Sequence, residues 1–151
     1  MKDVVTGFTC GSFDLLHAGH YMMLKYARDR CDRLIVGLQI DPTTDRKDKN
    51  KPIQSVHERW TMLRGCRYVD EIVIYHTECE LVNLLKLLES EISFRFIGED
   101  WKGGEYTGRS LGLNTIFVPR KHSYSSHNLR QRVYKEGIKL KEEKDYQSNP
   151  E

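Results

Sequence analysis

Two histidines, His17 and His20, lie three residues apart in the segment 11–20, which reads GSFDLLHAGH. Residues at this spacing share one face of a helix. An imidazolium donates from both ring nitrogens, and the start of a helix offers free N–H groups and a positive dipole end. Gly19 permits close approach of the backbone. The pattern predicts a site for a phosphate on which negative charge grows. Ordinary helix-start histidines and a metal site are the alternatives, but no third or fourth ligand has an evident spacing.

Alternating apolar and helical segments must position these histidines. Strands are expected over residues 4–10, 34–40, 71–75, 94–97 and 115–118. Helices are expected over residues 17–30, 55–64, 77–88 and 126–136, the second and third opened by capping boxes. This order predicts an α/β fold, a Rossmann-like, doubly wound parallel sheet of five strands in a single domain. We expect the domain to span residues 1–137, followed by a charged, flexible tail over 138–151.

Ligands of such sheets bind beyond the carboxyl ends of the strands, where the strand order switches. The loops to consider are therefore residues 10–20, 41–54, 98–110 and 119–127. The segment 41–51 is rich in lysine and arginine and has no apolar anchor beyond Pro42, so we expect a mobile loop.

Composition narrows the class of protein. The chain has 151 residues, of which 38% are hydrophobic and 30% charged, as in a globular domain. It has neither a run of about 18 apolar residues nor a signal-peptide pattern, so a cytoplasmic protein is expected. The formal net charge of +2 disfavours a nucleic-acid binder. None of the four cysteines forms a CxxC motif, which predicts free thiols.

Four segments together resemble the cytidylyltransferase family, which includes glycerol-3-phosphate, choline-phosphate and ethanolamine-phosphate cytidylyltransferases. Residues 11–20 resemble its G-x-F-D-x-x-H-x-G-H signature. Residues 67–71 (RYVDE) and 98–101 (GEDW) resemble the R-Y-V-D-E and G-D-D-W of the bacterial glycerol-3-phosphate enzymes. Residues 120–127 (RKHSYSSH) resemble the second signature, R-T-E-G-I-S-T-T, but replace T-E-G with Lys-His-Ser. The resemblance spans roughly residues 4 to 134, with an apparent insertion over 102–110.

The resemblance implies a role for individual residues. The residues implied in catalysis are His17, His20, Lys49 and Arg120. These four are also implied in nucleotide binding, together with Ser12, Phe13, Arg67, Asp100, Tyr124, Ser125 and Ser126. The acceptor is expected to meet Lys47, Arg59 and Trp101, while Asp14 orders the first loop. Simpler interpretations are a solvated basic loop, core packing of Trp101 and helix capping by the two serines.

The reaction implied is transfer of CMP from CTP to a phosphorylated alcohol, with release of pyrophosphate. Glycerol-3-phosphate is the favoured acceptor, and CDP-glycerol the favoured product. Mg²⁺ is expected on the triphosphate, with no metal site built from side chains. The family is commonly dimeric, so a homodimer that meets at residues 67–70 is expected. The alternatives are an adenylyltransferase that uses ATP with a sugar phosphate or a flavin, and a non-catalytic nucleotide sensor.

Overall fold

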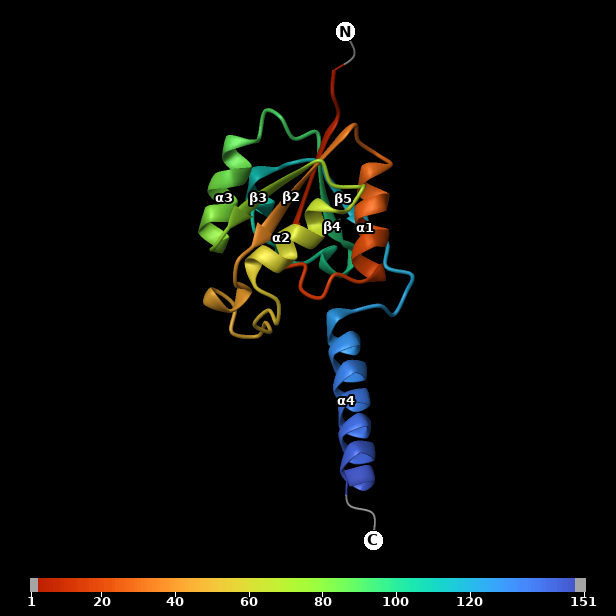
Figure 1. Ribbon diagram of the computed structural model, residues 1–151. Coiled ribbons are helices and arrows are strands. Elements are labelled where there is room, and N and C mark those ends of the chain that lie inside the picture. Colours follow the sequence, from red (N-terminus) through yellow and green to blue (C-terminus); the bar gives the residue numbers. More distant parts are fainter. Residues whose placement is uncertain (1–2, 149–151) are drawn as a thin grey trace.

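The computed structural model describes residues 3–148, in which strands and helices alternate along the chain (Figure 1). The strands are β1 (Thr6–Gly11), β2 (Arg33–Gln39), β3 (Glu71–Tyr75), β4 (Phe94–Gly98) and β5 (Thr115–Val118). The α-helices are α1 (Ala18–Arg28), α2 (Val56–Arg64), α3 (Glu78–Leu87) and α4 (Ser126–Ser148). Short 3₁₀ turns cover Pro42–Thr44, Glu99–Trp101 and Arg109–Leu111.

All five strands are parallel and pair in the order β3-β2-β1-β4-β5. This arrangement confirms the predicted Rossmann-like α/β fold. β1 lies at the centre, between β2 and β4, so the loops that follow β1 and β4 leave the sheet beside each other. Parallel sheets bind ligands at such a switch point. The topology therefore places the segment that carries His17 and His20 at the expected crevice.

Apolar side chains cover both faces of the sheet. On one face, Leu24 and Ala27 of α1 and Leu63 of α2 pack with Phe96 in a buried cluster. On the other, the α3 side chains pack with β1, β2 and β3 in a second cluster, made of Phe8, Ile35, Tyr75, Leu81, Leu85 and Ile92. Figure 1 shows α1 and α3 on opposite sides of the sheet. The inner strands β1 and β2 are buried along most of their length, which is why β2 reads as a continuous apolar run.

The predicted helix starts are confirmed, with one local difference. Ser55 and Glu58 form a reciprocal capping box at the start of α2. Thr77 caps α3 by accepting from the Glu80 N–H, but the Glu80 carboxylate accepts from the N–H of His76 instead of Thr77. Both arrangements supply acceptors to N–H groups that have no partner inside the helix.

The segment 41–51 has anchors that its composition did not indicate. Asp41 caps the 3₁₀ turn, and Pro42 is buried. Arg46 forms an ion pair with Glu78 at 3.1 Å, and the Asp45 carboxylate accepts from the Glu78 N–H. These anchors are polar, so the expectation of no apolar anchor beyond Pro42 agrees with the structure, and the mobility of the loop stays a prediction.

The last helix is longer than predicted. α4 continues without a break to Ser148, although we expected a helix end near residue 136 and a disordered tail. It projects away from the sheet and is exposed along most of its length (Figure 1). Residues 149–151 of that predicted tail lie outside the described part. No helix within residues 3–148 is long and apolar enough to cross a membrane.

Candidate active site

His17 and His20 form an unusual capping box at the start of α1. Nδ1 of His17 accepts a hydrogen bond from the N–H of Gly19 at 3.1 Å, and Nδ1 of His20 accepts from the N–H of His17 at 3.2 Å. The two rings stack with their centroids 3.8 Å apart. The backbone therefore fixes both imidazoles side by side, as the spacing of the two residues predicted.

Neither histidine can donate from both ring nitrogens in this geometry, unlike the imidazolium expected from sequence, because Nδ1 of each ring accepts from the backbone. Burial lowers the pKa of His20 to about 3, and the adjacent imidazole of His17 lowers it further. Burial also lowers the pKa of His17, helped by His122 and Arg120. Because each Nδ1 accepts from the backbone, each neutral ring carries its proton on Nε2. Only the Nε2 atoms are available to donate to a ligand.

Phe13 packs against His20. Its side chain is buried, and its ring centroid lies 5.3 Å from that of His20. Phe13 and Leu15 both have positive φ angles, of 48° and 49°, which non-glycine residues rarely adopt. Phe13 lines none of the cavities described below, so its side chain orders His20, although we expected it to line the nucleotide site. Strained backbone of this kind is concentrated at functional loops.

Asp14 joins three segments, as expected of a residue that orders the loop. It is buried, and it accepts from the N–H groups of Ile53 and Gln54 at 3.0 and 2.9 Å. Its other contact is an ion pair with Arg130 of α4 at 2.6 Å. Burial alone would raise the pKa of Asp14, but these hydrogen bonds and the arginine lower it below its ordinary value. The carboxylate stays ionised and holds α4 against the first loop.

Arg59 is a second connector and is placed differently from expectation. Its side chain is buried, with 2% exposure. The guanidinium donates to the carbonyls of Ser12, Gln39, Ile40 and Gln54 at 2.6 to 3.1 Å. These carbonyls belong to the loops after β1 and β2 and to the segment before α2. We expected Arg59 to bind the acceptor, but its donors are already used to position the loops.

A first cavity, which we call the histidine cavity, has a volume of about 720 Å³. His17, His20, Arg120 and Ser125 all line it. Tyr124 and Ser126 also line it, in agreement with the expected positions of the second signature. Ser125 caps α4 by accepting from the N–H of Asn128 at 3.1 Å, while Ser126 Oγ donates to the carbonyl of Asp14 at 3.1 Å.

Gly19, the glycine of the first signature, lies so close to two histidine rings that a side chain would not fit. A Cβ atom at Gly19 would lie 2.8 Å from Cε1 of His122 and 3.0 Å from Cε1 of His17. The structure thus places His122, one of the residues that depart from the second signature, directly over the start of α1. Its buried Nδ1 atom has no hydrogen-bond partner among the described residues.

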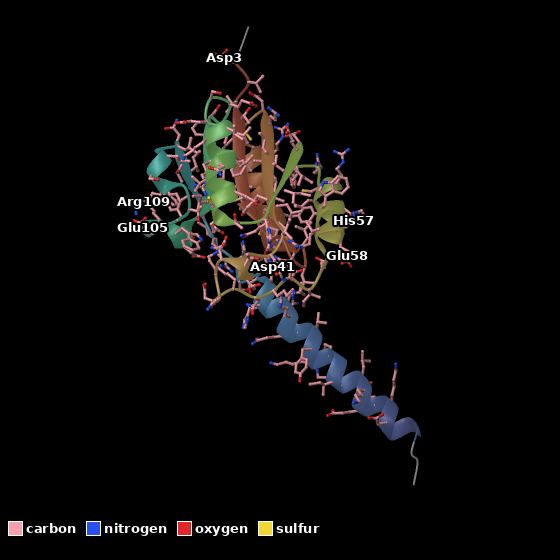
Figure 2. All side chains as sticks on the ribbon, turned by 90° about the vertical axis from the view of Figure 1, so that its left-hand side faces the viewer. Asp3, Asp41, His57, Glu58, Glu105 and Arg109 are labelled. Carbon is pink, nitrogen blue, oxygen red and sulfur yellow. The ribbon has the colours of Figure 1, made fainter. Side chains whose placement is uncertain are left out.

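A second cavity, which we call the basic cavity, has a volume of about 700 Å³. Its cationic lining residues are Arg46, Lys49, Arg95 and Arg130. The two cavities share Met23, Gly98 and Ser126 as lining residues, so they meet at the start of α4. Figure 2 shows Asp41, which follows β2, at this same end of the molecule. The arrangement can hold two anionic molecules side by side.

The two lysines of the basic loop differ in placement. Lys49 lines the basic cavity, and its Nζ lies 5.6 Å from the ring centroid of Trp101, which also lines it. Lys47 is exposed and lines neither cavity. We expected Lys47 beside the acceptor and Lys49 beside the nucleotide. In this structure Lys49 and Trp101 share one cavity, apart from the histidines.

Two further residues differ from expectation. Arg67 is exposed in the turn between α2 and β3, at the amino end of β3 and therefore at the edge of the sheet opposite to the cavities. Its guanidinium packs over the ring of Tyr68, with no contact to the nucleotide site. Asp100, which we expected as a buried carboxylate, is exposed and forms an ion pair with Arg120 at 3.1 Å. This pair lies at the mouth of the histidine cavity.

Sequence reasoning missed Arg95 of β4, the most buried of the cations that line the basic cavity. Its only signal was a charged residue inside an otherwise apolar strand, FRFIG. It also missed Arg46 and Arg130, which belong to segments in which several charged residues look alike.

The chain belongs to the cytidylyltransferase-like family, whose sequence model matches residues 8–132. It is 33% identical over 132 residues to the bifunctional protein HldE of Helicobacter hepaticus, a match that covers 87% of this chain and 27% of the relative. It is 49% identical over 67 residues to a probable ethanolamine-phosphate cytidylyltransferase of Encephalitozoon cuniculi, covering 44% of this chain and 21% of that protein. The chain thus spans about a fifth to a quarter of these curated relatives.

Among solved structures, the fold is similar to that of a lipopolysaccharide core biosynthesis protein from Thermoplasma volcanium. The TM-score is 0.61 at 22% sequence identity, and the match covers 81% of this chain and 99% of that chain. At this identity the similarity shows a shared fold.

The low pKa of His20 predicts how stability changes with pH. The unfolded chain binds a proton near pH 6.5 and the folded chain only near 3, so the unfolded state binds more protons between these values. The free energy of unfolding should therefore fall as the pH is lowered from about 6.5 toward 4, by about 1.4 kcal/mol for each pH unit at most. Urea denaturation at several pH values measures it.

The variant His20→Asn should show a smaller loss, because its amide oxygen can accept from the N–H of His17 without titrating. His57→Asn is the matched control, since His57 is exposed on α2 (Figure 2). Identical pH profiles for wild type and His20→Asn would contradict the assignment.

The placement of Arg59 predicts a structural effect. Arg59→Met leaves four carbonyls without their donor, and leaving a buried acceptor unsatisfied costs about 1–3 kcal/mol. The midpoint of urea denaturation should fall accordingly, whereas Arg64→Met, an exposed change on the same helix, should have a small effect. A stable Arg59→Met protein with only weaker acceptor binding would instead support the role expected from sequence.

Proposed function

We propose that this member of the cytidylyltransferase-like family transfers CMP from CTP to a phosphorylated alcohol, with glycerol-3-phosphate as the first acceptor to test. The observation that carries the proposal is the pair of cavities that meet at the start of α4. One presents two Nε2–H groups and Arg120, and the other presents Lys49 and further cations. The Encephalitozoon relative is a probable ethanolamine-phosphate cytidylyltransferase, a name that denotes the same class of reaction.

In this reaction the triphosphate occupies the histidine cavity. The Nε2–H groups of His17 and His20 donate to oxygens of the α-phosphate, and Arg120 and the hydroxyl of Ser125 meet the outer phosphates. A bound phosphate raises the pKa of both imidazoles, because a nearby negative charge favours the protonated form. The Nε2–H donors and Arg120 then lie where negative charge grows in the transition state.

The acceptor is held in the basic cavity with its phosphate toward Ser126. An oxygen of this phosphate attacks the α-phosphorus in line, forming a new P–O bond. The bond from the α-phosphorus to the bridging oxygen breaks, and pyrophosphate leaves with the electron pair. No covalent enzyme intermediate is needed, since positioning and charge stabilisation supply the catalysis.

We further propose that Mg²⁺ enters with the triphosphate. Residues 3–148 contain no group of three or more histidine, cysteine, aspartate or glutamate side chains placed to hold a metal ion. This donor set fits an ion that keeps phosphate and water ligands, as Mg²⁺ often does. The ion would neutralise charge on the phosphates.

We also propose that the chain forms a homodimer through the segment 67–70. The segment lies at the edge of the sheet away from the cavities, so pairing there leaves both cavities open. Light scattering after size-exclusion chromatography would give the mass, and a monomer at micromolar concentration would exclude the dimer.

The first test is pyrophosphate release. Purified protein with Mg²⁺ is mixed with CTP, ATP, GTP or UTP, each crossed with glycerol-3-phosphate, phosphoethanolamine, phosphocholine and sugar phosphates. We expect release with CTP and glycerol-3-phosphate. His17→Ala should lower kcat by about 10²- to 10³-fold, the usual loss for one transition-state donor. His57→Ala, an exposed change on α2, should have no such effect.

Each other outcome separates an alternative. Release with ATP and a sugar phosphate would replace the cytidylyl assignment by adenylyl transfer on the same fold. Nucleotide binding without release for any acceptor would favour a nucleotide sensor over an enzyme.

A further inference from the structure

Arg95 is a buried cation in the middle of the sheet. It lies on β4, opposite Phe8 of β1 and Thr115 of β5. Its side chain is only 3% exposed, yet it lines the basic cavity, together with Cys10 and Tyr75 on the α3 face of the sheet. A charge in this position costs free energy unless partners or a ligand compensate it.

The partners of Arg95 within the chain leave this charge only partly satisfied. Nη1 donates to the carbonyl of Thr107, and the guanidinium lies 5.3 Å from the ring centroid of Tyr106. The side chain of Cys10 is a further contact of Arg95. Its buried Nε atom has no hydrogen-bond partner among the described residues. The ion pairs of the cavity join Arg46 to Glu78 and Arg130 to Asp14, and none between described residues includes Arg95.

Glu78, a carboxylate that lines the same cavity, is already engaged by three side chains. Oε1 of Glu78 accepts from Gln39 and Arg46, both at 3.1 Å, and Oε2 accepts from the hydroxyl of Thr107. Nε of Arg46, which also lines the cavity, is a second buried donor without a partner among the described residues. This part of the cavity therefore has buried donors without partners among the described residues, which favours a ligand that supplies acceptor oxygens.

The position of Arg95 separates it from the reacting phosphates. It precedes Gly98 by three residues, and Gly98 is where the two cavities meet. At about 3.3 Å per residue, Arg95 lies roughly 10 Å deeper along the strand. An acceptor whose phosphate reaches the histidine cavity would thus bring its other end toward Arg95.

The loop after β4 packs against the guanidinium of Arg95. A Cβ atom at Gly108 would lie 3.0 Å from Nη1 of Arg95 and 2.7 Å from Cδ1 of Leu85, and the φ angle of Gly108 is 78°. The segment 102–110, an apparent insertion in the sequence, thus supplies Tyr106 and Thr107 to hold the guanidinium. Figure 2 shows Glu105 and Arg109 of this segment at the surface.

We propose that Arg95 determines acceptor specificity by binding the tail of the phosphorylated acceptor, and that this tail carries oxygen acceptors, as hydroxyl groups or a carboxylate. The proposal rests on the proposed function, because the acceptor phosphate defines which end is the tail. Ammonium tails are excluded, since like charges placed together in an interface are strongly unfavourable. Lys49 lies over the ring of Trp101, so this aromatic side chain already has a cation beside it.

Acceptor binding measured by calorimetry, with a non-hydrolysable CTP analogue present, tests the proposal. Four acceptors share a phosphate and differ in the tail: glycerol-3-phosphate, 3-phosphoglycerate, phosphoethanolamine and phosphocholine. We expect the wild type to bind at least one of the first two about tenfold or more tighter than phosphocholine, since tenfold needs only about 1.4 kcal/mol. Comparison of the first two distinguishes a hydroxyl tail from a carboxylate tail.

Arg95→Met should weaken the oxygen-tailed acceptor by about 10- to 100-fold, the usual worth of a charged hydrogen bond. Phosphocholine binding should stay equal or improve. The affinity of Arg95→Lys for this acceptor should lie between those of the wild type and Arg95→Met. Arg109→Met, an exposed arginine change in the segment after β4, is the control. Thermal stabilisation by the CTP analogue should persist in each variant, which shows that the histidine cavity is folded. If Arg95→Met does not fold, the tail preference of the wild type and of Arg95→Lys decides.

Three results would overturn the proposal. They are equal binding of phosphocholine and glycerol-3-phosphate by the wild type, an equal loss of all acceptors in Arg95→Met, and no binding of any acceptor. Tail-selective binding without pyrophosphate release would reject the proposed reaction while leaving the role of Arg95 intact.

Discussion

The site depends on the buried guanidinium of Arg59. The loops that leave a parallel sheet expose carbonyls with no partner in the ladder, and buried carbonyls need donors. Arg59 supplies donors to four of them, from the ends of β1 and β2 and from the segment before α2. Asp14 complements it by accepting from Ile53 and Gln54 and by pairing with Arg130. These two charges fix the relative positions of the first loop, the basic loop and α4. Histidines on a loop free to shift by an ångström would lose most of their catalytic value.

The neutral form of His17 and His20 is compatible with their position at the start of α1. Two charged rings stacked at 3.8 Å would repel each other and lose hydration, so the neutral form of both capping side chains is favoured. Their Nδ1 atoms satisfy backbone N–H groups that the start of α1 leaves open, and their Nε2 atoms face the cavity. The two histidine side chains thus cap α1 and also offer hydrogen-bond donors to an anion.

The two cavities divide the chemistry between them. The histidine cavity repeats the first and second signatures of the family, whereas the basic cavity is built largely from residues outside those signatures. Arg95 and the segment 102–110 belong to this second part. A shared transfer site joined to a variable acceptor site is a simple way for one fold to use different acceptors, because changes at the far end leave the phosphate ligands in place.

The sequence by itself determined the elements and the centre of the site. Strand runs, the capping residues Ser55 and Thr77, and the segment 11–20 act through neighbours in the chain, so their patterns are readable locally. The length of α4 was missed because a charged composition was given more weight than the helix-forming lysines and glutamates that compose it. What only the tertiary structure decided are the contacts between distant segments. Arg59 reaches the carbonyl of Ser12 across 47 residues, Arg67 falls at the far edge of the sheet, and Arg95 faces a cavity instead of the core. Strand order and loop packing settle these partners, and neither is encoded in the spacing of any one segment.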